Sequence, residues 1–323
     1  MKEILNNLYE YKTLSKETAK EVLVNIASAK YNPSQVASFM SVYLMRPITV
    51  EELSGFREAM LELCLKTEFN TNETIDIVGT GGDGKDTFNI STLSCFVVAG
   101  TGIKVTKHGN YGVSSVSGSS NVLEAIGYKF TNEKNILQKQ LEEAGLCFMH
   151  APLFHPAMKN VAPIRKELGV RTFFNMLGPI VNPSFPKYQL LGVYNLEMAR
   201  LYNYLLQNTN NDYVIMHSFD GYDEISLTGN YKIISREKEQ IIEPEKKLKQ
   251  SDLFGGKSVE ESAKIFMSVL KGEGVQAQNE VIIANACMAI HCVKKKSLED
   301  CTAEARESLE SKKALNAYKK LIE

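Results

Sequence analysis

GTGGDGKDTFNIST, residues 79–92, and KHGNYGVSSVSGSS, residues 107–120, are two glycine- and hydroxyl-rich segments that interrupt apolar runs. Between Asp86 and Glu124 there is no acidic residue, although Asp and Glu make up 38 of the 323 residues. Glycines let backbone N–H groups converge on an oxyanion, hydroxyls add donors, and a following helix contributes its N-terminal dipole. The two segments therefore predict a local anion-binding site of the kind that takes phosphate.

The sequence around the two segments predicts how they are held. A short buried strand is expected at residues 75–78 and another at 103–106, directly before the two segments. Apolar residues recur at helical spacing behind each segment: Leu93, Phe96 and Val97 behind the first, Val122, Leu123 and Ile126 behind the second. Two strand-loop-helix units would present their donors at one edge of a sheet, where open α/β sheets bind ligands.

Two other interpretations of the first segment are open. A glycine-rich turn between a strand and a helix is often only a tight connection, although two in succession beside Lys107 favour an anion site. Gly79, Gly81 and Gly84 also fit GxGxxG, the dinucleotide-binding pattern. That pattern needs an acid about 20 residues on to hold a ribose, and the corresponding strand offers only Lys104 and Lys107.

Composition sets outer limits. With 323 residues, 44% of them hydrophobic, the chain can bury a large core and suits one large or two unequal domains. A net charge of −1 gives no global attraction for nucleic acid or anionic membrane. The N-terminus lacks a signal-peptide pattern and no run approaches the roughly 18 apolar residues of a membrane span, so a soluble cytoplasmic protein is expected. Six cysteines without CxxC spacing predict buried free thiols rather than a zinc site.

The periodicity predicts an α/β fold with a small N-terminal all-helical domain and a large α/β domain, whose central mixed, mostly parallel sheet is flanked by helices. Helical spacing covers residues 1 to about 66, and strand and helix patterns alternate from residue 74. The five prolines from Pro152 to Pro183 indicate helices docked outside the sheet. Residues 236–249 are charge-rich and predict a solvated loop or edge strand. Further strands are expected at 147–149, 188–193 and 213–217, and helices at 129–144, 196–208 and 281–293.

Carboxylates gather in HSFDGYDEISLTG, residues 217–229, where Asp223 and Glu224 follow a predicted strand. Bare carboxylates would repel a phosphate, so they fit beside one only if a divalent cation lies between. Magnesium typically keeps one or two protein carboxylates, several waters and substrate oxygens. The alternative is that DGYDE is simply a polar turn.

Six motifs in fixed order carry a family resemblance that spans nearly the whole chain: GTGGDG, FNIST, KHGN, GSSNVLEAIG, FHPAMKNVAPIRKELGVRTFFNMLGPIVNP and DEIS. Together they resemble the anthranilate phosphoribosyltransferases, which catalyse the second step of tryptophan biosynthesis from chorismate. The resemblance implies transfer of phosphoribose from phosphoribosyl pyrophosphate to the anthranilate amine, releasing pyrophosphate. It also implies Mg²⁺ as cofactor and a homodimer formed through a helical domain at 1–67, completed by about 155–185. A phosphoribosyl pyrophosphate-binding domain at 70–323 would make up the remainder, with the site near the hinge and with no nucleic-acid or membrane partner.

The resemblance also implies site residues. Those implied for phosphoribosyl pyrophosphate are Gly79, Gly82, Asp83, Thr87, Asn89, Ile90, Ser91, Thr92, Lys107, His108, Gly109, Asn110, Ser114, Ser115 and Ser119. Those implied for anthranilate are Gly79, His108, Asn110, Pro152, His155 and Arg165, and those for magnesium are Ser91, Asp223 and Glu224. Lys107, Asn110 and Arg165 are the implied catalytic residues. Without the resemblance, Arg165 would be a surface cation, and His108 and His155 ordinary packed or polar histidines.

The sequence departs from the family pattern at two places. Tyr111 stands where many members have arginine after KHGN, and Ser120-Asn121 replace a more usual Ala-Asp pair.

Two other functions stay open. A pyrimidine nucleoside phosphorylase would share the fold and phosphate loops without needing Asp223 and Glu224 for metal. A non-catalytic nucleic-acid-binding relative would need a basic stripe, which a net charge of −1 disfavours.

Overall fold

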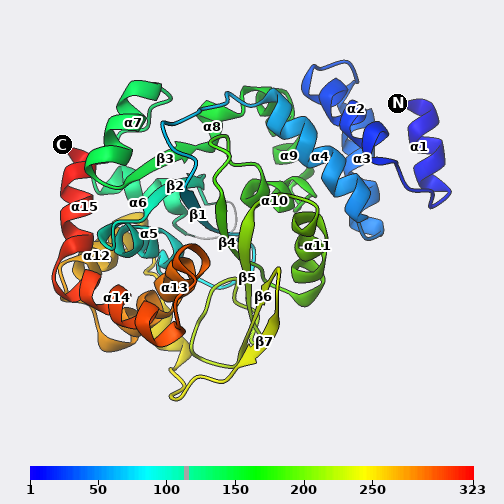
Figure 1. Ribbon diagram of the computed structural model, residues 1–323. Coiled ribbons are helices and arrows are strands. Elements are labelled where there is room, and N and C mark those ends of the chain that lie inside the picture. Colours follow the sequence, from blue (N-terminus) through cyan, green and yellow to red (C-terminus); the bar gives the residue numbers. More distant parts are fainter. Residues whose placement is uncertain (113–115) are drawn as a thin grey trace. The chain divides into compact units, whose positions relative to one another are not determined.

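The computed structural model describes residues 1–112 and 116–323, so the predicted site residues Ser114 and Ser115 lie outside the described residues. The chain separates into two compact units. Residues 1–67 and 151–183 form a helical unit, and residues 68–150 and 184–323 form an α/β unit (Figure 1). The helical unit is therefore built from two stretches of sequence that are far apart along the chain.

Helices make up the secondary structure of the helical unit. They are α1 (Lys2–Tyr9), α2 (Lys16–Ala27), α3 (Pro33–Met45), α4 (Val50–Leu63), α8 (Ala151–Phe154), η1 (Pro156–Asn160), α9 (Ala162–Leu168), α10 (Phe174–Leu177) and η2 (Gly178–Ile180). Side chains cap the starts of α2, α3 and α4, since Ser15, Asn32 and Thr49 each accept a hydrogen bond from a backbone N–H of the first turn. The core joins the two stretches, because the rings of Phe56 and Phe173 stack with centroids 4.5 Å apart.

A buried ion pair fixes the start of α4. The Glu52 side chain is fully buried and accepts hydrogen bonds from Arg46 Nη1 at 3.0 Å, Thr49 N at 3.0 Å and Leu14 N at 3.0 Å. Burial by itself raises the pKa of Glu52, but the Arg46 guanidinium and the two backbone N–H groups lower it overall. The network therefore joins three segments of the helical unit through one charged carboxylate.

Replacing Glu52 with Gln is expected to lower the free energy of unfolding by about 3–5 kcal/mol at pH 7, because it leaves Arg46 buried without its partner charge. A group with a lowered folded pKa stabilises above its unfolded pKa of about 4.3, and that contribution is lost as pH falls through the folded pKa. The gap between wild type and variant should thus narrow below about pH 4. Urea unfolding of wild type and variant at pH 7 and below about pH 4 measures this difference in the free energy of unfolding. Glu10→Gln, which removes an exposed pair with Lys12, serves as control and should cause no measurable loss.

The α/β unit is organised around one sheet, which in the described residues has seven strands in the order β3-β2-β1-β4-β5-β6-β7. The strands are β1 (Thr74–Gly79), β2 (Lys104–Gly109), β3 (Leu146–His150), β4 (Tyr188–Gly192), β5 (Asp212–Ser218), β6 (Tyr231–Ser235) and β7 (Glu239–Ile242). β1 to β5 pair in parallel, whereas β6 and β7 are antiparallel. The sheet is thus mixed and mostly parallel, which confirms the predicted fold class, and β7 confirms an edge strand within the charge-rich stretch.

Helices flank this sheet (Figure 1). They are α5 (Ile90–Gly100), α6 (Ser119–Ala125), α7 (Lys134–Glu143), α11 (Leu196–Gln207), η3 (Gln250–Leu253), α12 (Val259–Leu270), α13 (Gln276–Lys294), α14 (Leu298–Glu310) and α15 (Lys313–Ile322). No helix of the described ranges is long and apolar enough to span a bilayer. All six cysteines, each within those ranges, are free and buried, as the sequence predicted.

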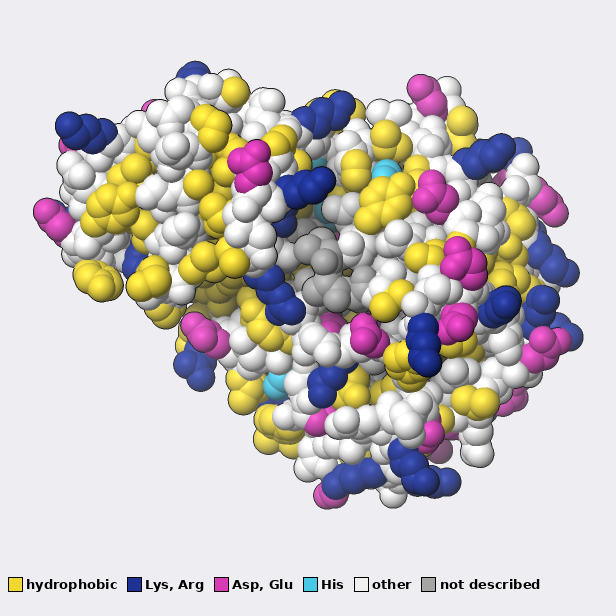
Figure 2. Space-filling view, turned by 180° about the vertical axis from the view of Figure 1, so that it is seen from behind, with side chains coloured by type: hydrophobic (Ala, Val, Ile, Leu, Met, Phe, Trp, Pro, Cys, Tyr) yellow, Lys and Arg dark blue, Asp and Glu magenta, His cyan; other side chains and the backbone are white. Residues whose placement is uncertain are grey.

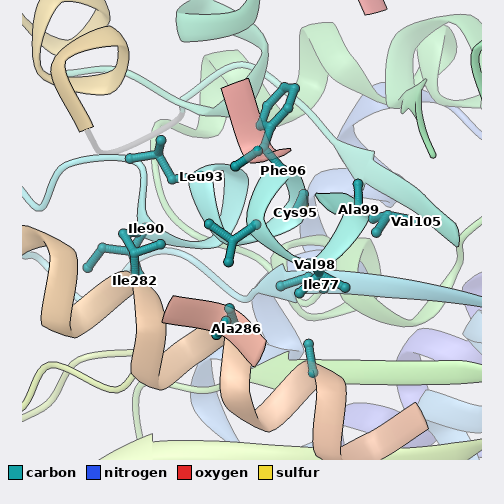
Figure 3. Close-up of a cluster of buried hydrophobic side chains, with 14 of the residues drawn as sticks. Ile77, Ile90, Leu93, Cys95, Phe96, Val98, Ala99, Val105, Ile282 and Ala286 are labelled. Atoms are coloured by element: carbon teal, nitrogen blue, oxygen red, sulfur yellow. The ribbon is translucent and has the colours of Figure 1, made fainter. Parts of the chain in front are cut away.

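Helix α5 is the central packing element of the α/β unit. Nearly all its side chains are buried, and Figure 3 shows Ile90, Val98 and Cys95 of α5 among Ile77 of β1 and Ile282 and Ala286 of α13. A parallel sheet buries both of its faces under helices. A helix that packs on the sheet and is itself covered by a second helix is apolar on nearly all sides. This packing fixes the first turn of α5 beyond the end of β1, where the first glycine-rich segment runs.

The strand order reverses between β1 and β4. From β1 the chain continues to β2 and β3 on one side, whereas β4 and β5 lie on the other. The last residues of the two strands, Gly79 and Gly192, are directly paired. In open α/β sheets, ligands bind at the carboxyl ends of strands at such a reversal. The topology therefore places a binding site beside Gly79, within the first glycine-rich segment.

Candidate active site

The carboxylate of Asp223 lies at the strand reversal. The backbone N–H of Gly81 donates to Asp223 Oδ2 over 2.7 Å. A Cβ added to Gly79 would overlap the Asp223 carboxylate, and one added to Gly192 would overlap its carbonyl oxygen. Both strand ends therefore require glycine, because the segment around Asp223 occupies the space where side chains would stand.

Glu224 is held by the far end of the same loop. The backbone N–H of Ser91, in the first turn of α5, donates to Glu224 Oε1 over 2.9 Å, and Thr87 Oγ1 lies 3.5 Å from Oε2. The first loop is thus fastened to two adjacent carboxylates, one at each of its ends. This brings together Ser91, Asp223 and Glu224, the three residues implied for magnesium.

Burial and mutual proximity disfavour the ionised form of these carboxyl groups. Burial, and after it the nearby Asp83 carboxylate, raises the pKa of Asp223 to about 7. Burial also raises the pKa of Glu224, with Asp223 adding to it and Lys107 opposing it. Burial likewise raises the pKa of Asp83. A cation bound beside this cluster would favour its ionised form.

The donor set fits magnesium better than a metal held by protein alone. Within residues 1–112 and 116–323, no group of three or more His, Cys, Asp or Glu side chains is arranged to hold a metal ion. Asp223 and Glu224 supply two carboxylates. Magnesium characteristically takes one or two carboxylates and completes its shell with water and substrate phosphate oxygens.

Lys107 supplies positive charge at the same edge of the sheet. It stands on β2, next to β1, and is buried, with its Nζ donating to the carbonyl oxygen of Ile77 over 2.6 Å. The neighbouring His108 is also buried, and its backbone N–H donates to Asp76 Oδ1 over 3.0 Å. An ammonium has three N–H donors, of which Ile77 takes one. Lys107 is thus placed to act on an anion bound at the strand ends.

The second glycine-rich segment is tied to the first. Asn89 Nδ2 donates to the carbonyl oxygen of Ser117 over 2.9 Å. The carbonyl oxygen of Asn110 accepts from Ser119 Oγ at 3.2 Å and from Ser120 N at 3.1 Å. The described parts of the two segments are therefore joined by a hydrogen bond between Asn89 and Ser117.

Other predicted residues of the α/β unit contribute backbone rather than side chains. Ile90 and Thr92 bury their side chains at the start of α5. Gly109 ends β2, where a Cβ would overlap the Ser119 hydroxyl and the Phe148 ring. Gly82 has a positive φ of 75°, a conformation that favours glycine. These positions shape the two loops, and their roles in substrate binding stay predictions.

Pro152, His155 and Arg165 belong to the helical unit. Arg165 lies on α9, with Nη2 3.3 Å from Asn175 Oδ1 and its guanidinium 5.3 Å from the centre of the Phe174 ring. Burial lowers its pKa, although a guanidinium stays charged in proteins. His155 is buried, and that burial lowers its pKa to about 4, so its imidazole is neutral at pH 7. Pro152 is exposed.

Known proteins match this chain along its whole length. The profile described as "Glycosyl transferase family, a/b domain" matches residues 71–315, and that of the same family's helical bundle domain matches residues 2–64. An anthranilate phosphoribosyltransferase of Flavobacterium johnsoniae is 60% identical, over 100% of this chain and 99% of the relative. The chain belongs to the anthranilate phosphoribosyltransferase family. The counterpart in Bacteroides thetaiotaomicron is 52% identical, over 100% of this chain and 99% of the relative.

Solved anthranilate phosphoribosyltransferases have the same fold. The enzyme of Thermus thermophilus superposes with a TM-score of 0.92 at 32% identity, covering 98% of each chain. The enzyme of Saccharomyces cerevisiae, in a complex with phosphoribosyl pyrophosphate and Mg, superposes with a TM-score of 0.90 at 26% identity, covering 98% of this chain and 95% of that one.

The departures from the pattern of anthranilate phosphoribosyltransferases have defined structural roles. Asn121 Oδ1 accepts the backbone N–H groups of Gly112 at 2.9 Å and Gly118 at 3.0 Å. An aspartate carboxylate could accept the same two bonds, so Asn121 preserves the loop closure without the charge. Ser120 and Tyr111 both contact His150.

Sequence reasoning missed two residues of this site. Gly192 was assigned only to a strand, because its close approach to Asp223 depends on which strands are neighbours. Asp76, a fully buried acid within β1, orients the His108 backbone. An acid inside an otherwise apolar strand was a signal, since buried carboxylates generally have partners.

Proposed function

We propose that this protein transfers 5-phosphoribose from phosphoribosyl pyrophosphate to the amine of anthranilate, giving N-(5-phosphoribosyl)anthranilate and pyrophosphate. This is a pentosyl transfer and the second step of tryptophan biosynthesis from chorismate. The observation that supports the proposal is the strand reversal, where the first donor-rich loop binds the buried carboxylates of Asp223 and Glu224 and is hydrogen-bonded to the second loop. The family membership supplies the two substrates.

The chain's own groups would act on the leaving group. Lys107 and the backbone amides of the first loop stabilise the charge that develops on pyrophosphate, in a site whose donors are already oriented. Magnesium, held by Asp223, Glu224 and the Ser91 hydroxyl, would neutralise phosphate charge. Asp83, Thr87, Asn89 and Ser119 line the loops that hold the substrate's phosphates in place.

The acceptor needs little acid–base help. The aromatic amine of anthranilate is neutral near pH 7, so it can attack without losing a proton first. The ribosyl carbon would pass through an oxocarbenium-like state, and no side chain is assigned as a covalent nucleophile. In this proposal Gly79, His108 and Asn110 of the α/β unit face the anthranilate ring. Pro152, His155 and Arg165 of the helical unit are further candidate anthranilate residues, as the resemblance implies. Positioning and electrostatics then account for the catalysis.

Replacing Arg165 with Ala is expected to raise the KM for anthranilate about tenfold or more. The variant loses a guanidinium that can donate two parallel hydrogen bonds to the carboxylate of anthranilate. The KM for phosphoribosyl pyrophosphate should change less. Lys166→Ala is the matched control, since Lys166 is the next cation on α9 and is exposed. Steady-state kinetics with each substrate varied in turn measures both constants. A larger effect on phosphoribosyl pyrophosphate would contradict the assignment.

Product stoichiometry tests the function itself. The proposal requires one pyrophosphate released for each anthranilate consumed. The same preparation should not cleave thymidine or uridine with inorganic phosphate, as a pyrimidine nucleoside phosphorylase would. It should also give no salt-sensitive shift in the mobility of DNA, which a nucleic-acid-binding relative would produce.

We further propose that the protein works as a cytoplasmic homodimer joined through the helical unit. Four large hydrophobic side chains at the ends of α1 and α3 are exposed by about half or more: Tyr9 (55%), Tyr11 (77%), Leu44 (49%) and Met45 (81%). Figure 2 shows hydrophobic side chains gathered on the surface of the N-terminal helices. Such a patch is typical of an interface. The six free cysteines of the protein also suit a reducing compartment such as the cytoplasm. A monomeric mass in light scattering would contradict the dimer.

A further inference from the structure

His150, the last residue of β3, is surrounded by side chains from three other segments of the α/β unit. Ser120 Oγ lies 2.9 Å from His150 Nδ1, and both residues are buried. The Phe130 ring stacks on the imidazole with centroids 4.1 Å apart and an interplanar angle of 14°. The Tyr111 ring meets it edge-on at 5.1 Å and 86°. The imidazole is therefore fixed in both position and rotation.

One of these contacts leads to the candidate active site. Ser120 uses its hydroxyl for His150 and its backbone N–H for the carbonyl oxygen of Asn110, at 3.1 Å. Ser119 Oγ donates to that same oxygen at 3.2 Å. The first turn of α6 is thus a bridge, with the imidazole on one side and Asn110 on the other.

The protonation state of His150 suits a hydrogen bond to a hydroxyl. Burial lowers the pKa of His150 to about 4, so the ring is neutral at pH 7. A neutral imidazole has one donor and one acceptor nitrogen, and a serine hydroxyl can serve as either partner. The pair is therefore satisfied without a buried charge, which favours a rigid link.

The sheet supports the same arrangement. His150 pairs with Gly109 across β2 and β3, so the imidazole stands beside the strand end from which the second loop departs. Gly109 and Gly118 are both packed so closely that a Cβ on either would overlap a neighbour. The backbone at Gly109 and at Gly118 is thus closely packed on both sides of Asn110.

We propose that His150 is a positioning residue for the anthranilate end of the site, acting through Ser120 to fix Asn110. The assignment rests on the proposed function, in which Asn110 faces anthranilate. Tyr111 and Ser120, two of the three residues that depart from the family pattern, then form one unit around this imidazole. The aromatic side chain at 111 supports the ring that anchors the loop.

Four variants test the link. His150→Phe keeps the stacking and removes the bond, and Ser120→Ala removes the bond from the other side. Each should raise the KM for anthranilate about five- to tenfold, the loss expected for one buried hydrogen bond, and leave that for phosphoribosyl pyrophosphate within about twofold. The combined variant should be no worse than either single one, because both remove the same bond. His150→Asn, which retains a polar nitrogen or oxygen near the Nδ1 position, should recover most of the loss.

A purely structural role predicts different results. Loss of folded protein would lower apparent kcat and leave both KM values unchanged. Ser308→Ala is the control for this pattern, because Ser308 is a buried serine that donates to the carbonyl oxygen of Val97 in α5. That pattern in the His150 variants, additive effects, or no recovery with His150→Asn would overturn the assignment. Wild-type protein that does not consume anthranilate would overturn the proposed function and this assignment together. An active wild type with unaffected variants would overturn the assignment alone.

Discussion

Joint replacement of Asp223 by Asn and Glu224 by Gln is expected to lower kcat by about 1000-fold or more, because the proposed magnesium site would lose both of its carboxylates. The two substitutions keep the size of each side chain and can still accept the N–H groups of Gly81 and Ser91. The loop should therefore stay in place while the charge is lost. Turnover at saturating substrates and excess magnesium measures the effect, with thermal unfolding as a check on folding.

Asp220→Asn is the matched control for this pair. Asp220 lies in the same segment, but its carboxylate accepts the hydroxyls of Ser226 and Thr228 and so closes the turn instead of facing the loops. Its variant should keep kcat within about twofold of wild type. An unchanged kcat in the double variant would rule out the metal role of Asp223 and Glu224.

Replacing Lys107 with Met is expected to lower kcat/KM for phosphoribosyl pyrophosphate by roughly 100- to 1000-fold, because a buried, oriented ammonium stabilises charge far better than water does. Methionine preserves an unbranched side chain of similar length, so packing in β2 should survive. The control is Lys104→Met on the same strand, where Nζ donates to the carbonyl oxygen of Leu141. Equal effects of the two variants would show that charge at the strand end has no special role.

Much of the fold follows from local patterns in the sequence. The strand expected at 75–78 is β1 (Thr74–Gly79), and that expected at 213–217 is β5 (Asp212–Ser218). Both are apolar runs bounded by polar or glycine residues, which is a signal contained within a few residues. The loops and the Asp223–Glu224 pair were visible for the same reason, since each is contiguous.

The rest depends on tertiary packing. The helix expected at 129–144 begins only at Lys134, because Phe130 packs on His150 and Thr131 Oγ1 accepts the N–H of Glu133 in a turn. The periodic pattern alone cannot distinguish a phenylalanine on a buried helix face from one that packs from a loop, as Phe130 does. The role of Gly192 required the strand order, which no local pattern contains.

The same limit applies to His150. Its partners come from residues 111, 120 and 130, and no spacing among them marks a motif. Two of the three were noticed only as departures from the family pattern. Their common contact became visible once β2 and β3 were paired, which places the loop and the imidazole at the same sheet edge.

In the proposed function, the strand reversal binds phosphoribosyl pyrophosphate with magnesium for transfer of phosphoribose to anthranilate. The most direct test follows the loss of anthranilate fluorescence in the presence of phosphoribosyl pyrophosphate, with magnesium or with excess chelator. We expect anthranilate fluorescence to fall with magnesium and to stay constant with chelator, and the fall should return when magnesium is added back. No loss from folded protein in either condition would contradict the transferase function, and equal loss in both would contradict the metal site.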